Sequence, residues 1–215
     1  MRRILIAAVL LVALLSLTLP TAARADGIDL LNKFGTISIS NAGIISKGSE
    51  LSQFKGISTG HSLGRVSFST GALLSGSIRG GGTFSSVGSS FRVIGIGNGG
   101  QPKGVIFDGA FVGTISWTLL SQRGPNMIFQ LSGKLSGQLL NGRIVSGTTT
   151  QLFWFSSSQL DKGIGHLTSG ESHLAATPEP GTLVLLGFGL LGIASKTRWR
   201  PFRRPLSNDE ATAGK

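Results

Sequence analysis

Glycine interrupts residues 26–177 every few positions, which leaves room for short strands and turns rather than for long helices. The same segment is rich in Ser and Thr and poor in Ala and Glu, a composition that favours strands and turns. Only residues 27–34 favour a short helical turn. The sequence therefore predicts an all-β domain in this part of the chain.

Several segments alternate apolar and polar residues with the period of two that is typical of half-buried strands. Residues 35–40, 65–70 and 111–117 follow this pattern. Residues 73–78, 83–87, 91–96 and 104–107 are further predicted strands, and 91–96 is apolar on both faces over part of its length, as in a central strand. The run Arg79-Gly80-Gly81-Gly82 predicts a tight hairpin. About nine to eleven strands in about 150 residues predict an antiparallel β-sandwich or flattened barrel. A β-solenoid is the alternative, and it is disfavoured because no fixed repeat length is present.

The strongest local signal is the pair Asn141-Gly142, which is preferred in two-residue type I′ turns because both positions need a positive φ. Apolar residues before it share one face of a strand, namely Phe129, Leu131, Leu135 and Leu139. A two-residue turn predicts three apolar cross-strand pairs. The pairs are Leu139 with Ile144, Leu131 with Leu152, and Phe129 with Trp154.

The N-terminus has the organisation of a secretory signal peptide. Arg2 and Arg3 precede an uncharged apolar core over residues 4–19, and Ala23-Arg24-Ala25 provides an A-x-A cleavage site. We predict export through the Sec translocon and removal of residues 1–25 by signal peptidase, with cleavage specified by Ala23 and Ala25. An uncleaved signal anchor is the alternative.

The C-terminal region contains Pro178-Glu179-Pro180 and then an uncharged apolar run from Thr182 to Ala194. As a helix this run would cover about 20 Å, whereas a bilayer core needs about twenty residues. It therefore predicts a temporary transmembrane helix. The basic residues after it predict a cytoplasmic end and place the preceding domain outside. These residues are Lys196, Arg198, Arg200, Arg203 and Arg204.

This three-part order resembles the PEP-CTERM sorting signal of Gram-negative bacteria. In that family the signal is read by exosortase, a membrane protease-transferase. The resemblance implies processing near Pro178 to Pro180 and then release to, or attachment at, the cell surface. An ordinary C-terminal tail anchor is the alternative.

The predicted organisation therefore has four parts. Residues 1–25 form the signal peptide, and residues 26–174 form the exported β-rich domain. Residues 175–204 form the sorting signal, and residues 205–215 form a disordered tail. The chain contains no cysteine, so the exported domain depends on its own core for stability.

The formal net charge of +11 suggests an anionic partner, but most of the excess lies outside the domain. The signal peptide contributes +3, the tail contributes +3, and residues 26–177 contribute +5 through eleven bases and six acids. The bases of the domain occur singly. We therefore expect no nucleic-acid partner, and the charge supports only mild attraction to acidic extracellular polysaccharide.

One motif suggests a serine hydrolase. Gly56-x-Ser58-x-Gly60, followed by Asp108 or Asp161 and by His166, gives the hydrolase order of Ser, acid and His. The nucleophile elbow needs a strand before the serine and a helix after it, and the sequence predicts no such helix.

Two further motifs also lack their structural context. Ser52-x-x-Lys55 requires one helical turn, and the S-D-N and K-T-G patterns that accompany such a motif are absent. The glycines of Gly95-x-Gly97-x-x-Gly100 precede Gln101-Pro102, where a phosphate-binding helix would have to begin. We therefore predict no catalytic residue, no cofactor and a non-enzymatic protein.

Binding chemistry has two candidates. His166, Glu171 and His173, with Asp161 nearby, contain neither a thiolate nor a helical i, i+4 pair, so we predict no metal site. Four aromatic residues suggest either a sugar-stacking platform or a buried core: Trp117, Phe153, Trp154 and Phe155.

The main hypothesis is an exported, non-enzymatic protein that is transiently anchored in the inner membrane. It would then serve at the cell surface or in the extracellular matrix. The alternatives are a carbohydrate-recognition module and a serine hydrolase that uses Ser58.

Overall fold

The computed structural model describes residues 27–59 and 61–176, which form eleven strands and a short helix. The strands are β1 (Ile28–Lys33), β2 (Thr36–Ser40), β3 (Gly43–Phe54), β4 (Gly64–Ser69), β5 (Leu73–Ser77), β6 (Gly81–Phe84), β7 (Ser90–Ile96), β8 (Lys103–Arg123), β9 (Asn126–Leu139), β10 (Ile144–Ser156) and β11 (Ile164–Ala176). The helix is α2 (Ser157–Asp161).

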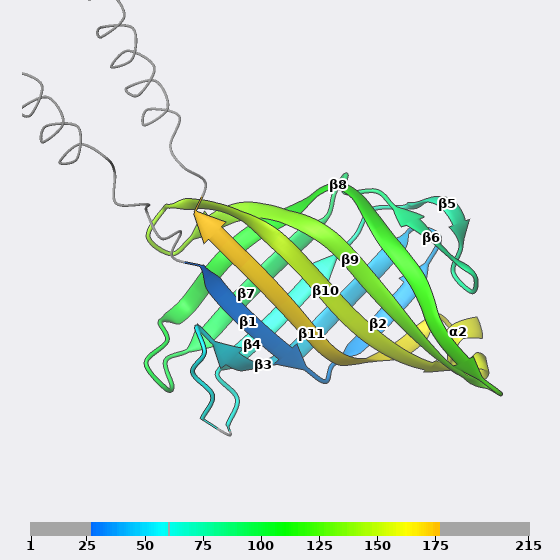
Figure 1. Cartoon of the computed structure of the whole chain (residues 1–215), viewed down its shortest axis with the longest axis horizontal. Coiled ribbons are helices and arrows are strands. Elements are labelled where there is room, and N and C mark those ends of the chain that lie inside the picture. Colours follow the sequence, from blue (N-terminus) through cyan, green and yellow to red (C-terminus); the bar gives the residue numbers. More distant parts are fainter. Residues whose placement is uncertain (1–26, 60, 177–215) are drawn as a thin grey trace, which may run out of the picture. The chain divides into compact units, whose positions relative to one another are not determined.

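Eight of the strands close into an antiparallel barrel (Figure 1). Their order around the ring is β8-β7-β4-β3-β1-β11-β10-β9, and the pairing of β9 with β8 closes it. The all-β prediction is confirmed, and of the predicted architectures the barrel is the one observed. A closed antiparallel ring also excludes the solenoid alternative.

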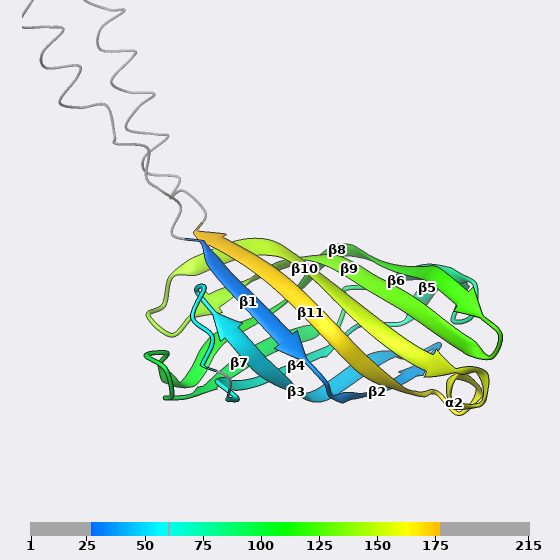
Figure 2. The same cartoon turned by 60° about the horizontal axis from the view of Figure 1, so that its bottom comes forward.

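The remaining elements lie at one end of the barrel, which we call the helix end (Figure 2). There β6 pairs with β8, β5 pairs with β6, and β2 pairs with β11 and β3. Leu160 of α2 is buried, and Ile39 N–H donates to the carbonyl of Gly163 at 2.8 Å. At the opposite end, the terminal end, β1 begins and β11 ends, since Ile28 pairs with Leu174.

Aromatic side chains fill much of the barrel interior. Trp117 stacks on Phe129 with ring centroids 4.6 Å apart, and its indole N–H donates to the carbonyl of Ile78 at 2.9 Å. The other buried aromatic residues among those described are Phe54, Phe68, Phe84, Phe91, Phe107, Phe111, Phe153 and Phe155. This packing supplies a core for a domain that contains no disulfide.

A buried polar network lies between β1, β3, β10 and β11. The amide of Asn32 donates to Ser49 at 2.7 Å and to Gln151 at 2.9 Å. Gln151 donates in turn to Thr149 at 2.8 Å, and Ser172 donates to Thr149 at the same distance. Because these groups satisfy one another, the barrel tolerates their burial. No local sequence pattern predicts this network, because its residues come from four different strands.

The prediction of a helical turn over residues 27–34 is wrong. Residues 28–33 form β1, which pairs with both β11 and β3. The local preference is overridden because Ile28 and Leu30 bury their side chains in the barrel, while Asp29 remains on the outer face.

The predicted register of the β9–β10 hairpin is also wrong, by one residue. Leu131 lies opposite Gln151, and Phe129 lies opposite Phe153. Asn141 is not among the residues with a positive φ, whereas Gly142 has φ +81°. The connection is therefore longer than a two-residue type I′ turn.

The register shift changes which side chains point inward, because neighbouring strand residues face opposite sides. Phe153 and Phe155 are fully buried, whereas Ile144 and Trp154 are exposed by 65% and 36%. The apolar inner face predicted for β9 is confirmed, since Phe129, Leu131 and Leu135 are buried.

The predicted cleavage residues Ala23 and Ala25, the motif Pro178 to Pro180, the apolar helix, the basic cluster and the tail lie outside the described residues. Over residues 27–59 and 61–176, none of the helical structure has the length and apolar character needed to cross a bilayer.

Candidate functional site

The residues of the hydrolase hypothesis are distributed over both ends of the barrel. The connection between β3 and β4, which carries exposed Ser58, lies at the terminal end (Figure 1). Helix α2, which ends at Asp161, and the start of β11, which contains His166, lie at the helix end. Asp108, on β8, forms an ion pair with Arg92 at 3.0 Å. The structure does not bring the predicted serine, acid and histidine together.

The two other enzymatic motifs adopt extended or loop structure. Ser52 lies within β3, where its hydroxyl donates to the carbonyl of Leu31 at 3.2 Å, and Lys55 has φ +49° just after the strand. Gly97 and Gly100 lie in the connection between β7 and β8, with φ of +85° and +83°. Strand β8 follows them, so a helix N-terminus for phosphate is missing from this loop.

A charged cluster lies on the outer face where β1 meets β11. Nδ1 of His173 is 2.6 Å from Oδ1 of Asp29, and Nε2 of His173 is 3.0 Å from Oε1 of Glu171. The hydrogen bond to Asp29 is the main cause that raises the pKa of His173 above 6.5, and the charges of Asp29 and Glu171 add to it. The cluster thus favours the imidazolium form.

The metal hypothesis is only partly matched by these positions. Glu171 and His173 share one face of β11 as expected, but His166 lies beside Trp154, and Asp161 forms an ion pair on α2. The carboxylates of the cluster occupy opposite nitrogens of one imidazole, so one ion cannot contact all three groups. No group of three or more ligands within the described part of the chain is arranged to hold a metal ion.

The aromatic platform is reduced to a single residue. Trp117, Phe153 and Phe155 are buried in the core, and only Trp154 reaches the outer face. The local reason is the register of β10, which turns Trp154 outward between two inward phenylalanines.

Trp154 borders a shallow groove of about 300 Å³ at the helix end. Its other lining residues come from β8 and β9: Ser121, Arg123, Asn126 and Ile128. His166 flanks Trp154 with ring centroids 6.4 Å apart, and the Gln159 amide nitrogen is 3.4 Å from Nε2 of His166. The groove therefore combines an aromatic surface with a guanidinium and several neutral polar groups.

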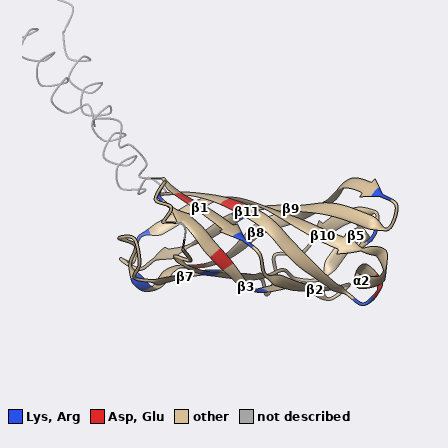
Figure 3. Ribbon diagram, turned by 90° about the horizontal axis from the view of Figure 1, so that it is seen from below, with Lys and Arg blue, Asp and Glu red and all other residues tan. Residues whose placement is uncertain are grey.

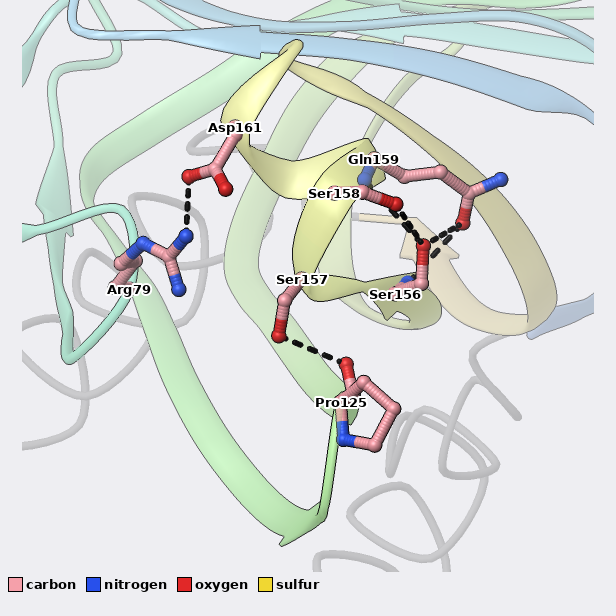
Figure 4. A network of polar contacts seen from close by, with 7 residues as sticks. All are labelled: Arg79, Pro125, Ser156, Ser157, Ser158, Gln159 and Asp161. Carbon is pink, nitrogen blue, oxygen red and sulfur yellow. Dashed lines mark hydrogen bonds and ion pairs between the residues drawn. The ribbon is translucent and has the colours of Figure 1, made fainter.

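Polar contacts at α2 hold the strands that form this groove (Figure 4). Ser157 donates to the carbonyl of Pro125 in the β8–β9 turn through its backbone N–H at 2.7 Å and its hydroxyl at 3.0 Å. Ser156 and Gln159 form a capping box, and Arg79 forms an ion pair with Asp161. These contacts fix the ends of β8, β9 and β10 relative to one another.

A comparison with protein families finds a match at the C-terminal end of the chain. Residues 176–200 match the PEP-CTERM protein-sorting motif, a range that contains Pro178, Glu179 and Pro180 and ends before Arg203 and Arg204. No curated protein and no solved structure matches the chain. The chain thus carries the sorting motif of exported proteins that exosortase processes, which implies transient membrane anchoring before surface display.

Proposed function

We propose that this chain is a non-enzymatic protein of the cell surface or extracellular matrix, exported through Sec and delivered by exosortase. The observation that carries the proposal is the sorting motif at residues 176–200, which begins at the last residue of β11 in the sequence. The separation of Ser58 from Asp161 and His166 supports a role other than hydrolysis.

Mass spectrometry of both ends of the mature protein, in cells with and without exosortase, tests the sorting step. We expect the N-terminus at Asp26 in both strains and a C-terminus near Pro178 to Pro180 only where exosortase is present. A Glu179→Ala variant should keep its full C-terminus, whereas Glu50→Ala on β3 serves as the matched control. Identical C-terminal ends in the two strains would contradict exosortase processing and favour a tail anchor.

The non-enzymatic role has a separate test. Folded protein and its Ser58→Ala variant are treated with a fluorophosphonate probe, and both are expected to stay unlabelled. Labelling that disappears in Ser58→Ala would restore the hydrolase alternative.

The carbohydrate-recognition alternative is favoured by a specific observation, the groove beside exposed Trp154. Stacking on an aromatic ring and hydrogen bonds to amide and guanidinium groups suit a sugar ring, which has apolar faces and a polar edge. This alternative is compatible with a surface role, since a matrix protein can be held there by binding polysaccharide.

A further inference from the structure

The outer faces of β8, β9 and β10 form one continuous surface that runs along the strands. Their residues align in register from the row Val112–Lys134–Thr148 to the row Ser121–Ile128–Trp154. The rise of β9 between Lys134 and Ile128 is about 20 Å. A chain-like ligand of several units could therefore lie along this surface, which we call the strand track.

The strand track is hollowed at both ends. One hollow of about 570 Å³ lies beside Lys134, where β8 bulges at Gly113 with φ +75°, and three threonines of β10 are among the residues that line it. The other is the groove of Trp154 and Arg123. Gln130 lies between the two hollows, and its amide donates at 2.9 Å to Ser132, which lines the first hollow. Both hollows thus belong to one surface that consists mainly of hydroxyl and amide side chains, includes the exposed apolar residues Val112 and Ile128, and has Trp154 at one end.

The charge of the strand track has a single sign. Residues 109–160 contain no Asp or Glu, and their three basic residues are Arg123, Lys134 and Arg143. Arg123 and Lys134 take part in none of the ion pairs found among the described residues. The nearest bordering acid on β11 is Glu171, opposite Thr150, and His173 pairs with it. Charged residues are otherwise scattered over the barrel (Figure 3).

We propose that the strand track binds a linear anionic polysaccharide, with a sugar ring stacked on Trp154 and acidic groups at Arg123 and Lys134. This inference deepens the proposed surface role and rests on it, because such a polymer would meet the protein only after export. The neutral hydroxyl and amide groups between the two cations match the hydroxyls of the intervening sugars.

A nucleic acid is the competing anionic polymer, and the charge density favours the polysaccharide. Phosphates recur about every 3.4 Å along one strand of nucleic acid. The strand track offers Arg123 and Lys134 at its two ends and neutral side chains between them. Widely spaced carboxylates on a neutral sugar backbone fit that pattern better.

The test is a binding titration of the full chain with uronic-acid oligosaccharides derived from alginate. A polyoxyethylene detergent is used, because a detergent with a sugar headgroup would compete for Trp154. We expect Trp154→Ala to weaken binding by about tenfold and Lys134→Gln by roughly two- to fivefold. Lys47→Gln, an exposed lysine on β3 away from the strand track, is the matched control and should bind as wild type.

The comparison ligands are a neutral glucan oligosaccharide and single-stranded DNA of similar length. Weaker binding of both supports the proposal. Equal binding of the neutral glucan, tighter binding of DNA, or equal affinities of Trp154→Ala and wild type would overturn it. Thermal unfolding of each variant shows that the fold is retained. Mass spectrometry of the two ends of the mature protein tests sorting separately. If processing is correct but the polysaccharide does not bind, only the proposed ligand of the strand track is refuted.

Discussion

The buried network around Gln151 gives the sharpest prediction about stability. Gln151→Leu removes three hydrogen bonds, two with Asn32 at 2.9 and 3.3 Å and one with Thr149 at 2.8 Å. It leaves Oδ1 of Asn32 buried without the amide that it accepts from. Lost hydrogen bonds cost about 1 kcal/mol each, and an orphaned buried acceptor costs about 1–3 kcal/mol. We therefore expect the free energy of unfolding to fall by roughly 4–6 kcal/mol.

Urea unfolding of the mature exported protein, followed by tryptophan fluorescence, measures this loss as a lower midpoint at unchanged slope. Buried Trp117 becomes exposed on unfolding, whereas Trp154 is already partly exposed in the folded barrel. Gln122→Leu, an exposed glutamine on β8, is the control and should change stability by less than about 0.5 kcal/mol. The double variant Asn32→Leu/Gln151→Leu should lose less unfolding free energy than the two single variants together, and the difference should be about 1–3 kcal/mol. Strictly additive losses of unfolding free energy, or a Gln151→Leu variant as stable as wild type, would refute the energetic role of this network.

Three further predictions concern the barrel surface and its turns. The raised pKa of His173 implies that its cluster stabilises the fold below pH 6.5 and that this stabilisation is lost as the pH rises through the folded-state pKa. Melting temperatures measured across this pH range should therefore fall in the wild type, and His173→Gln should lack this fall. Gly147→Ala would place a Cβ 1.7 Å from the carbonyl oxygen of His173, so β10 and β11 must separate. Calorimetry should then show that the free energy of unfolding falls by about 1–3 kcal/mol or more. Gly142→Ala should cost about 1–2 kcal/mol in urea unfolding because of φ +81°, and an unchanged midpoint would contradict that.

The class of fold can be predicted from the sequence because apolar and polar residues alternate clearly in those strands that have only one apolar face. Residues 129–139 carry polar side chains on the other face, so their inner face could be assigned correctly. Residues 144–155 are different, since Ile144 and Trp154 on one face compete with Phe153 and Phe155 on the other. Their register depends on the conformation at Gly142, which the Asn-Gly pair does not determine.

The surface sites depend on contacts between distant parts of the chain. Asp29 meets His173 across 144 positions of the sequence, and Asn32 meets Gln151 across 119. No local pattern indicates either contact, because both arise from the closure of β1 onto β11 and the packing across the barrel. The Glu171-x-His173 spacing did indicate a shared face, but the third partner came from β1.

The position of the sorting motif relative to the last strand is compatible with processing of a folded barrel. β11 pairs with β1 along Ile28 to Lys33, and these pairs help to close the ring without any disulfide. The pairing of β11 with β10 ends at Ala176, opposite Val145. Pro178 follows almost at once, and proline has no N–H to donate to a ladder. Cleavage near Pro178 to Pro180 would thus remove none of the paired residues, so the barrel and its strand track can persist after the C-terminal segment is removed.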